Sequence, residues 1–184
     1  FTILDKDDQL SLIKQIIKAE NLDQSQFSPK LIQSKIDHWK NKALNPNEIK
    51  SETLDNLVDE KSLSIYQIYQ ARLFEINCLD FGDLLLQCIN LFKVPDIHKR
   101  YSNNFKYIHV DEYQDTNAAQ YKWLKLLGSH HKNVCCVGDD DQSIYSWRGA
   151  EVDNMLRFEK EFENAKIIRL KQNYRSTNNI LKSA

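Results

Sequence analysis

The feature that most constrains this chain is the alternation, after residue 80, of short apolar runs with helix-length segments. Runs of strand length and segments of helical periodicity follow one another in the order 105–110, 118–127, 134–137, 152–162 and 166–170. Strands joined through helices pair in parallel, because a crossover of about a dozen residues returns the chain to the same end of the sheet. The alternation therefore predicts an α/β fold, in which helices flank part of a parallel sheet.

The residues before this alternation carry apolar side chains at helical spacing instead. Two helix starts are marked by a capping residue followed by proline, at Ser28-Pro29 and at Asn45-Pro46. A longer apolar stripe over residues 63–73 predicts a further helix. We therefore expect this part of the chain to be all-α.

The change of pattern divides the chain into two predicted parts. Residues 1–78 form the all-α subdomain, and residues 79–184 form the α/β part. Asp80 is expected to cap the first helix of the second part, which ends before Pro95. A last helix is expected to begin near Ser176, whose hydroxyl suits an N-cap.

Glycine content and charge exclude two simple interpretations. The only glycines are Gly82, Gly128, Gly138 and Gly149, and no two have the spacing of G-x-x-x-x-G-K-S/T or G-x-G-x-x-G. A phosphate-binding loop of either kind is therefore excluded within this chain. The formal net charge is −1, so no basic block signals nucleic acid, and such an interpretation must rest on specific residues.

Acidic residues stand at the end of the first predicted strand. Asp111 and Glu112 directly follow the run 105–110, and ligands of open α/β sheets bind at the carboxyl ends of strands. A carboxylate there is suited to hold Mg²⁺ against nucleotide phosphates, and a neighbouring glutamate is suited to take a proton from water. A pair of solvated acids is the alternative interpretation of this dipeptide.

The second predicted strand, 134–137, is also followed by polar residues. Gly138 and three aspartates lead to Gln142, whose amide can donate and accept hydrogen bonds. Tyr145, Trp147 and Arg148 follow, and together they combine stacking surfaces with a phosphate-binding fork, as in single-strand binding. The alternative is that Trp147 anchors the loop to the core.

The third predicted strand, 166–170, ends in the same manner. Tyr174 and Arg175 follow it, just before the expected helix start. The guanidinium of Arg175 is suited to reach a γ-phosphate, and the ring of Tyr174 is suited to stack on a base.

These stretches together resemble a known family. The motifs are Asp-Glu-Tyr-Gln-Asp-Thr at 111–116, Gly-Asp-Asp-Asp-Gln-Ser-Ile-Tyr-Ser-Trp-Arg-Gly-Ala at 138–150 and Gln-Asn-Tyr-Arg-Ser at 172–176. They are similar to those of the UvrD, Rep and PcrA helicases of superfamily one, most closely of the PcrA type. Residues 1–5 and 79–85 also look like that family. The resemblance implies a partial RecA-like parallel sheet with a helical insertion subdomain.

The resemblance also implies a role for each candidate residue. It implies that Glu112, Gln142 and Arg175 are catalytic. It also implies that Gln142 and Arg175, together with Tyr174, bind ATP. In the family pattern the positions match as follows: Asp111 coordinates Mg²⁺, Glu112 is the general base, Gln142 links the γ-phosphate to the DNA site, Tyr174 packs on adenine, Arg175 is an arginine finger, and Tyr145, Trp147 and Arg148 contact single-stranded DNA.

The expected function is that of part of an ATP-dependent 3′-to-5′ DNA helicase and translocase, which uses Mg-ATP on single-stranded DNA and at single-strand/duplex junctions in repair or replication. The chain begins at Phe1 and has no phosphate loop, so we expect a fragment that is inactive alone, whose ATP site is completed by other segments of the same polypeptide. No oligomer is implied.

Two alternatives remain at this point. One is the helicase portion of a recombination helicase–nuclease, and the other is a non-catalytic nucleic-acid or interaction module. No apolar run approaches the roughly 18 residues of a membrane span, and the cysteines lack C-x-x-C spacing, so a cytoplasmic location without membrane contact is expected.

Overall fold

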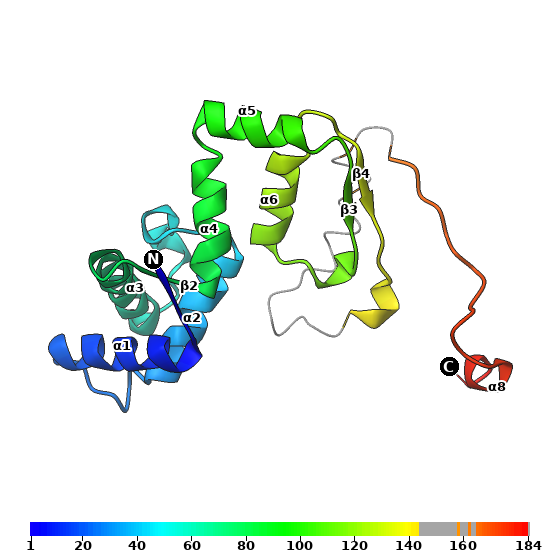
Figure 1. Ribbon diagram of the computed structural model, residues 1–184. Helices are drawn as coiled ribbons and strands as arrows, with labels where there is room; N and C mark the ends of the chain where they lie inside the picture. The colour runs from blue at the N-terminus through cyan, green and yellow to red at the C-terminus, as the bar shows by residue number, and fades with distance from the viewer. Residues whose placement is uncertain (144–157, 159–161, 163–164, 184) are drawn as a thin grey trace.

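The computed structural model describes residues 1–143, 158, 162 and 165–183 (Figure 1). Its helices and strands are β1 (Thr2–Leu4), α1 (Lys6–Ala19), α2 (Pro29–Asn41), α3 (Leu57–Glu75), β2 (Cys78–Asp80), α4 (Phe81–Leu91), α5 (Pro95–Asn104), β3 (Ile108–Val110), α6 (Ala118–Leu127), β4 (Val134–Cys136) and α8 (Asn178–Leu181). Short 3-10 turns are η1 (Pro46–Glu48), η2 (Ser51–Thr53), η3 (Tyr113–Asp115) and η4 (Asp140–Gln142). The mixture of helices and parallel strands confirms the α/β prediction.

Helix α2 begins at the capping residue that the sequence indicates, and α1 and α3 are capped by Asp5 and Asn56. The side chain of Asp5 accepts hydrogen bonds from the backbone of Asp7 and Asp8, each at 2.9 Å, and Ser28 caps α2 from directly before Pro29. The three helices bury one apolar cluster, whose members are Ile13, Ile16, Ile17, Ile32, Ile36, Ile65, Tyr66, Tyr69 and Leu73. The helical stripes are thus packing faces. The helix predicted at Asn45-Pro46 is only the turn η1.

Strand β1 was not predicted, and the all-α expectation for residues 1–78 is wrong there. It pairs in parallel with β2, with Thr2 opposite Cys78 and Leu4 opposite Asp80. A strand of three residues is too short to show an alternating pattern. Its partner β2 follows α1, α2 and α3, which we call the helical unit. The two strands are therefore far apart in the sequence, and only the three-dimensional structure shows that they pair.

A buried charged cluster joins the helical unit to α4. The Lys40 ammonium lies 2.6 Å from Asp80 and 2.8 Å from Asp83, and all three side chains are at most 1% exposed. Tyr69 donates a further hydrogen bond to Asp80 at 2.9 Å. Asp80 and Asp83 also form the capping box of α4, as expected for Asp80. Burial raises the pKa of the Asp83 carboxyl, and the Lys40 charge opposes this.

The second pair of strands is formed by β3 and β4, which are parallel, with Ile108 opposite Val134 and Val110 opposite Cys136. Helix α6 connects them and lies between α4 and the strands in Figure 1. Gly128 ends α6, as predicted, and the space above it is filled by a Val134 methyl group, 2.8 Å from where a Cβ would lie. Strand β3 begins at Ile108 and is therefore shorter than the predicted run 105–110. Helix α5 occupies residues 95–104, which the sequence interpretation left unassigned.

The third predicted strand is not formed. Residues 166–170 have no regular secondary structure, and Ile167, Ile168 and Leu170 are 56%, 69% and 86% exposed. A strand exists only beside a partner that takes its backbone hydrogen bonds, and none of the described strands lies beside this segment. The helix predicted over 152–162 lies outside the described residues, apart from Phe158 and Phe162.

Among the described residues, no helix combines the length and apolar character needed to cross a membrane.

Candidate active site

The carboxyl ends of β3 and β4 lie at the same edge, because the two strands are parallel. The backbone continues this pairing beyond the strands. Val137 N–H donates to the Val110 carbonyl at 2.8 Å, and Tyr113 N–H donates to the Val137 carbonyl at 3.0 Å. The segments that follow the two strands, which begin at Asp111 and Gly138, are therefore held against each other.

Asp111 and Glu112 form an exposed acidic pair directly after β3. Glu112 has φ 51° and ψ 43°, in the left-handed region that residues other than glycine seldom adopt. The Asp111 Oδ1 atom accepts a hydrogen bond from the Glu112 N–H at 2.9 Å. Ala43 and Lys132 have a similar φ, so this conformation shapes the turn after β3 and does not by itself mark Glu112 as functional.

Gln114 is the residue that the sequence interpretation missed. Its side chain is buried, at 1% exposure, and its Nε2 donates to Glu112 Oε2 at 2.7 Å. Its Oε1 accepts from the Asp139 backbone N–H at 3.1 Å. Gln114 lies two residues after Glu112 within the motif 111–116, and this position is the only signal that the sequence offers. Its contact with Asp139 spans 25 residues, so only the three-dimensional structure reveals it.

Gln142 also belongs to this arrangement. It lies in η4 with an exposed side chain, whose Nε2 donates to Asp139 Oδ2 at 2.6 Å. The structure therefore brings together Asp111, Glu112 and Gln142, three of the predicted residues. Asp139 and Gln114 connect the second strand end to the first.

Tyr113 anchors this corner in the core. Its side chain is 2% exposed and meets the ring of Phe158 edge to face, with centroids 5.7 Å apart. Phe158 in turn stacks on Phe162 at 4.5 Å. Thr116 Oγ1 donates to the Tyr113 carbonyl at 2.7 Å and so fixes the end of the turn.

Tyr174 and Arg175 lie elsewhere. In Figure 1 the segment from residue 165 leads away from β3 and β4, and Tyr174 is 87% exposed. Asn173 Oδ1 accepts from the backbone N–H groups of Arg175 and Ser176 at 2.8 and 2.9 Å. These bonds hold a bend before Thr177, the N-cap of α8, so the helix begins after Ser176 and is not capped by it. Among the described residues, no hydrogen bond or ion pair joins Arg175 to Glu112 or Gln142. The predicted DNA-contact residues Tyr145, Trp147 and Arg148 lie outside the described residues.

The strand ends suit a hard cation in their donor chemistry. Asp111 and Glu112 present carboxylate oxygens at an exposed edge, and such oxygens are the ligands that Mg²⁺ prefers. Within the described ranges no group of three or more histidine, cysteine or acidic side chains is gathered for a metal. Mg²⁺ sites commonly use one or two carboxylates together with substrate phosphates, so this set fits.

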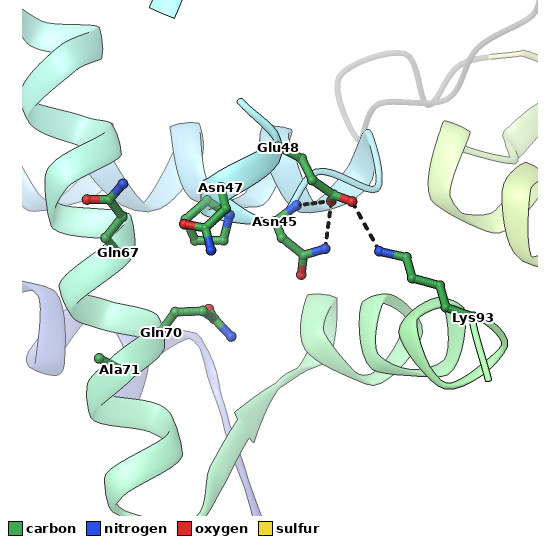
Figure 2. A pocket seen from close by; sticks show the side chains of 8 residues that line it. Asn45, Asn47, Glu48, Gln67, Gln70, Ala71 and Lys93 are labelled. Carbon is green, nitrogen blue, oxygen red and sulfur yellow. Dashed lines mark hydrogen bonds and ion pairs between the residues drawn. The ribbon is translucent and has the colours of Figure 1, made fainter. Parts of the chain in front are cut away.

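A separate cavity of about 530 Å³ lies between α3, η1 and Lys93 (Figure 2). Glu48 is held there by the Asn45 backbone N–H at 2.9 Å and by Lys93 Nζ at 3.1 Å. These bonds, with the Asn45 N–H the strongest influence, lower the pKa of the Glu48 carboxyl to about 2. None of the candidate site residues lines this cavity, which therefore belongs to the joint between helices and not to the strand ends.

The parallel strands β3 and β4, followed by acidic residues at their carboxyl ends, place the chain in the α/β class. In open sheets of this class, ligands bind at the carboxyl ends of the strands. The family model described as the UvrD/REP helicase N-terminal domain matches residues 1–163, and the chain belongs to this family. The family resemblance of the motifs is thereby confirmed.

Named relatives match over the entire chain. It is 50% identical to a probable DNA helicase II homolog of Rickettsia felis and 51% identical to DNA helicase II of Rickettsia typhi, and it covers 28% of each of those proteins. It is 48% identical to the ATP-dependent DNA helicase PcrA of Staphylococcus aureus, of which it covers 25%. The chain thus spans about a quarter of the length of these relatives.

Proposed function

We propose that these residues are part of an ATP-dependent DNA helicase and translocase that moves 3′ to 5′ on single-stranded DNA and unwinds duplex at junctions. The observation that carries this proposal is the hydrogen-bonded connection of Glu112 to Gln142, through Gln114 and Asp139, at the ends of adjacent parallel strands in a chain of a helicase family. The names of the relatives, DNA helicase II and ATP-dependent DNA helicase PcrA, support the proposal of a helicase.

The proposed chemistry is hydrolysis of ATP. Glu112 accepts the proton of the attacking water, and Asp111 holds Mg²⁺, which neutralises phosphate charge when bound. The Gln142 amide forms a hydrogen bond with the γ-phosphate. Because Gln142 lies in η4, loss of this phosphate changes the position of η4 and so links the nucleotide to the DNA site. These roles require the carboxylates to face an open edge, and both Asp111 and Glu112 are exposed.

Five further residues take their roles from the family pattern. Tyr174 packs on adenine, and Arg175 stabilises negative charge on the transferred phosphoryl group. Trp147 stacks on a base of single-stranded DNA, and Tyr145 and Arg148 also contact the strand. Because the segment from residue 165 leads away from β3 and β4 (Figure 1), the role of Arg175 requires a rearrangement of residues 165–176 when the nucleotide site is assembled.

The site is shared with other segments of a longer polypeptide. This chain has no phosphate-loop glycine pattern, so the phosphate loop is supplied from elsewhere. We therefore propose that the 184 residues alone hydrolyse ATP negligibly. We also propose that the active protein works without a second copy. Its proposed place of action is the cytoplasm, on DNA under repair or replication.

The test is DNA-stimulated ATP hydrolysis by the gene product that contains these residues. Glu112→Gln should lower kcat by about 100-fold or more, because the amide cannot take the proton of the attacking water. Glu60→Gln makes the same change at an exposed position of α3 and should leave kcat unchanged. A Glu112→Gln protein with the kcat of the control would refute the proposal.

A further inference from the structure

We propose that Gln114 is a positioning residue that ties the Glu112 carboxylate to the segment 138–142, so that the two strand ends move as one unit. The proposal rests on the proposed function, because it gives Glu112 the role of the base. Gln114 has no proposed contact with Mg²⁺ or with the phosphate, and it acts only through Glu112. Its evidence is the pair of hydrogen bonds that the Gln114 amide makes in opposite directions.

The orientation of this amide is fixed by its two partners. The Asp139 backbone N–H can only donate, so the atom facing it must be the carbonyl oxygen of Gln114. The NH₂ group must then face Glu112, whose carboxylate accepts. No side chain that is only a donor or only an acceptor satisfies both partners, so the position requires a group that does both, as the Gln114 amide does.

The amide has no room to leave this position. Gln114 is 1% exposed, and a Cβ placed on Gly138 would lie 2.7 Å from its Oε1. Glycine at 138 therefore allows the backbone of the second strand end to approach the amide closely. The hydrogen bond to the charged Glu112 is short, at 2.7 Å, as is typical of bonds to ionised groups.

The bonds continue to the proposed phosphate-sensing side chain. Gln142 Nε2 donates to Asp139 Oδ2 at 2.6 Å, and the Asp139 N–H donates to Gln114. A connected path thus runs from Gln142 through Asp139 and Gln114 to Glu112. A displacement of η4 is therefore transmitted to the base carboxylate, while the Asp111 bond restrains only the Glu112 backbone.

The first test needs neither ATP nor DNA. Hydrogen exchange of the Asp139 amide is measured in the nucleotide-free gene product that contains these residues. Gln114→Met keeps the length of the side chain and removes both bonds, so it should speed this exchange by about tenfold or more. Gln24→Met, at an exposed position, is the matched control and should leave the rate unchanged.

The second test separates positioning from binding. Gln114→Met should lower kcat for DNA-stimulated ATP hydrolysis by about tenfold or more, with the KM for ATP changed less than about twofold. Added to Glu112→Gln, it should have no further effect, because it acts through Glu112. Gly138→Ala, which crowds the same amide from the other side, should lower kcat as well and serves if Gln114→Met does not fold.

The outcomes distinguish this inference from the proposed function. If Glu112→Gln abolishes hydrolysis but Gln114→Met and Gly138→Ala keep the wild-type kcat, the positioning role is refuted and the proposed function stands. If Glu112→Gln leaves hydrolysis unchanged, both fail. An unchanged Asp139 exchange rate in Gln114→Met would also overturn the bridge.

Discussion

Lys40 illustrates how a single residue holds two parts of this chain together. Its ammonium group is almost fully buried between two carboxylates, and the rings of Tyr66 and Tyr69 lie 5.6 and 5.2 Å from it. A buried ion pair adds little net stability, but the loss of one partner leaves an uncompensated charge in the core. The cluster therefore makes Lys40 indispensable.

Lys40→Met should lower the free energy of unfolding by about 3–5 kcal/mol, because Asp80 and Asp83 would then face each other without a cation. Urea unfolding followed by circular dichroism measures the change. Lys42→Met, at the exposed C-cap of the same helix, should cost far less. Equal effects of the two substitutions would contradict this account of the cluster.

At the scale of elements, sequence patterns located the long helices and the strand ends but not their partners. Caps such as Ser28 and Asp80 and the acidic pair after β3 were visible because their signals are local. Strand β1 and the Gln114 bridge were not, because each is defined by a partner distant in the sequence. The predicted strand over 166–170 had the right composition but finds no neighbour among the described strands.

The turn η1 is held to the end of α4 through Glu48, and this contact should depend on pH. The pKa of Glu48 falls from 4.5 to about 2 on folding. Its contribution to stability is therefore complete above the unfolded value of 4.5 and is lost as the pH falls towards 2. Figure 2 shows Glu48 between Asn45 and Lys93, the two groups that favour its ionised form.

Glu48→Gln should therefore destabilise the chain at neutral pH and lose this effect in acid. Unfolding free energies measured from about pH 7 down to about pH 3 should approach each other for Glu48→Gln and the wild type, since the stabilisation by ionised Glu48 shrinks as the pH falls from 4.5 towards about 2. Glu52→Gln, at an exposed position, should not show this convergence. A difference between Glu48→Gln and wild type that stays constant with pH would be inconsistent with the contact.

For the whole molecule, packing is uneven along the sequence. Among the described residues, the apolar cluster of α1, α2 and α3 and a second one, formed by Ala43, Leu86, Ile89 and Ala119, both lie within residues 1–127. Residues 166–171, in contrast, are exposed and have no regular secondary structure. Segments with little burial and no regular hydrogen bonding open at low free-energy cost. Within a longer protein, the apolar side chains of this segment need a covering neighbour.

Brief trypsin treatment of the 184-residue chain should therefore cut after Lys166, Arg169 or Lys171 before it cuts after Lys125. Lys125 is also exposed, but it lies in α6, and proteases need an extended backbone. Mass spectrometry of the first fragments identifies the sites. Early cleavage at Lys125, with 166–171 intact, would contradict this description of the chain.

The parallel pairing of β1 with β2 makes residues 5–77 one crossover connection between adjacent strands. A crossover needs only about a dozen residues, so most of this connection is not required to join the strands. The register of β1 and β2 fixes only where the connection starts and stops. The helical unit can therefore gain, lose or exchange residues in related proteins without shifting the strands, provided that the replacement again places a buried cation against Asp80 and Asp83.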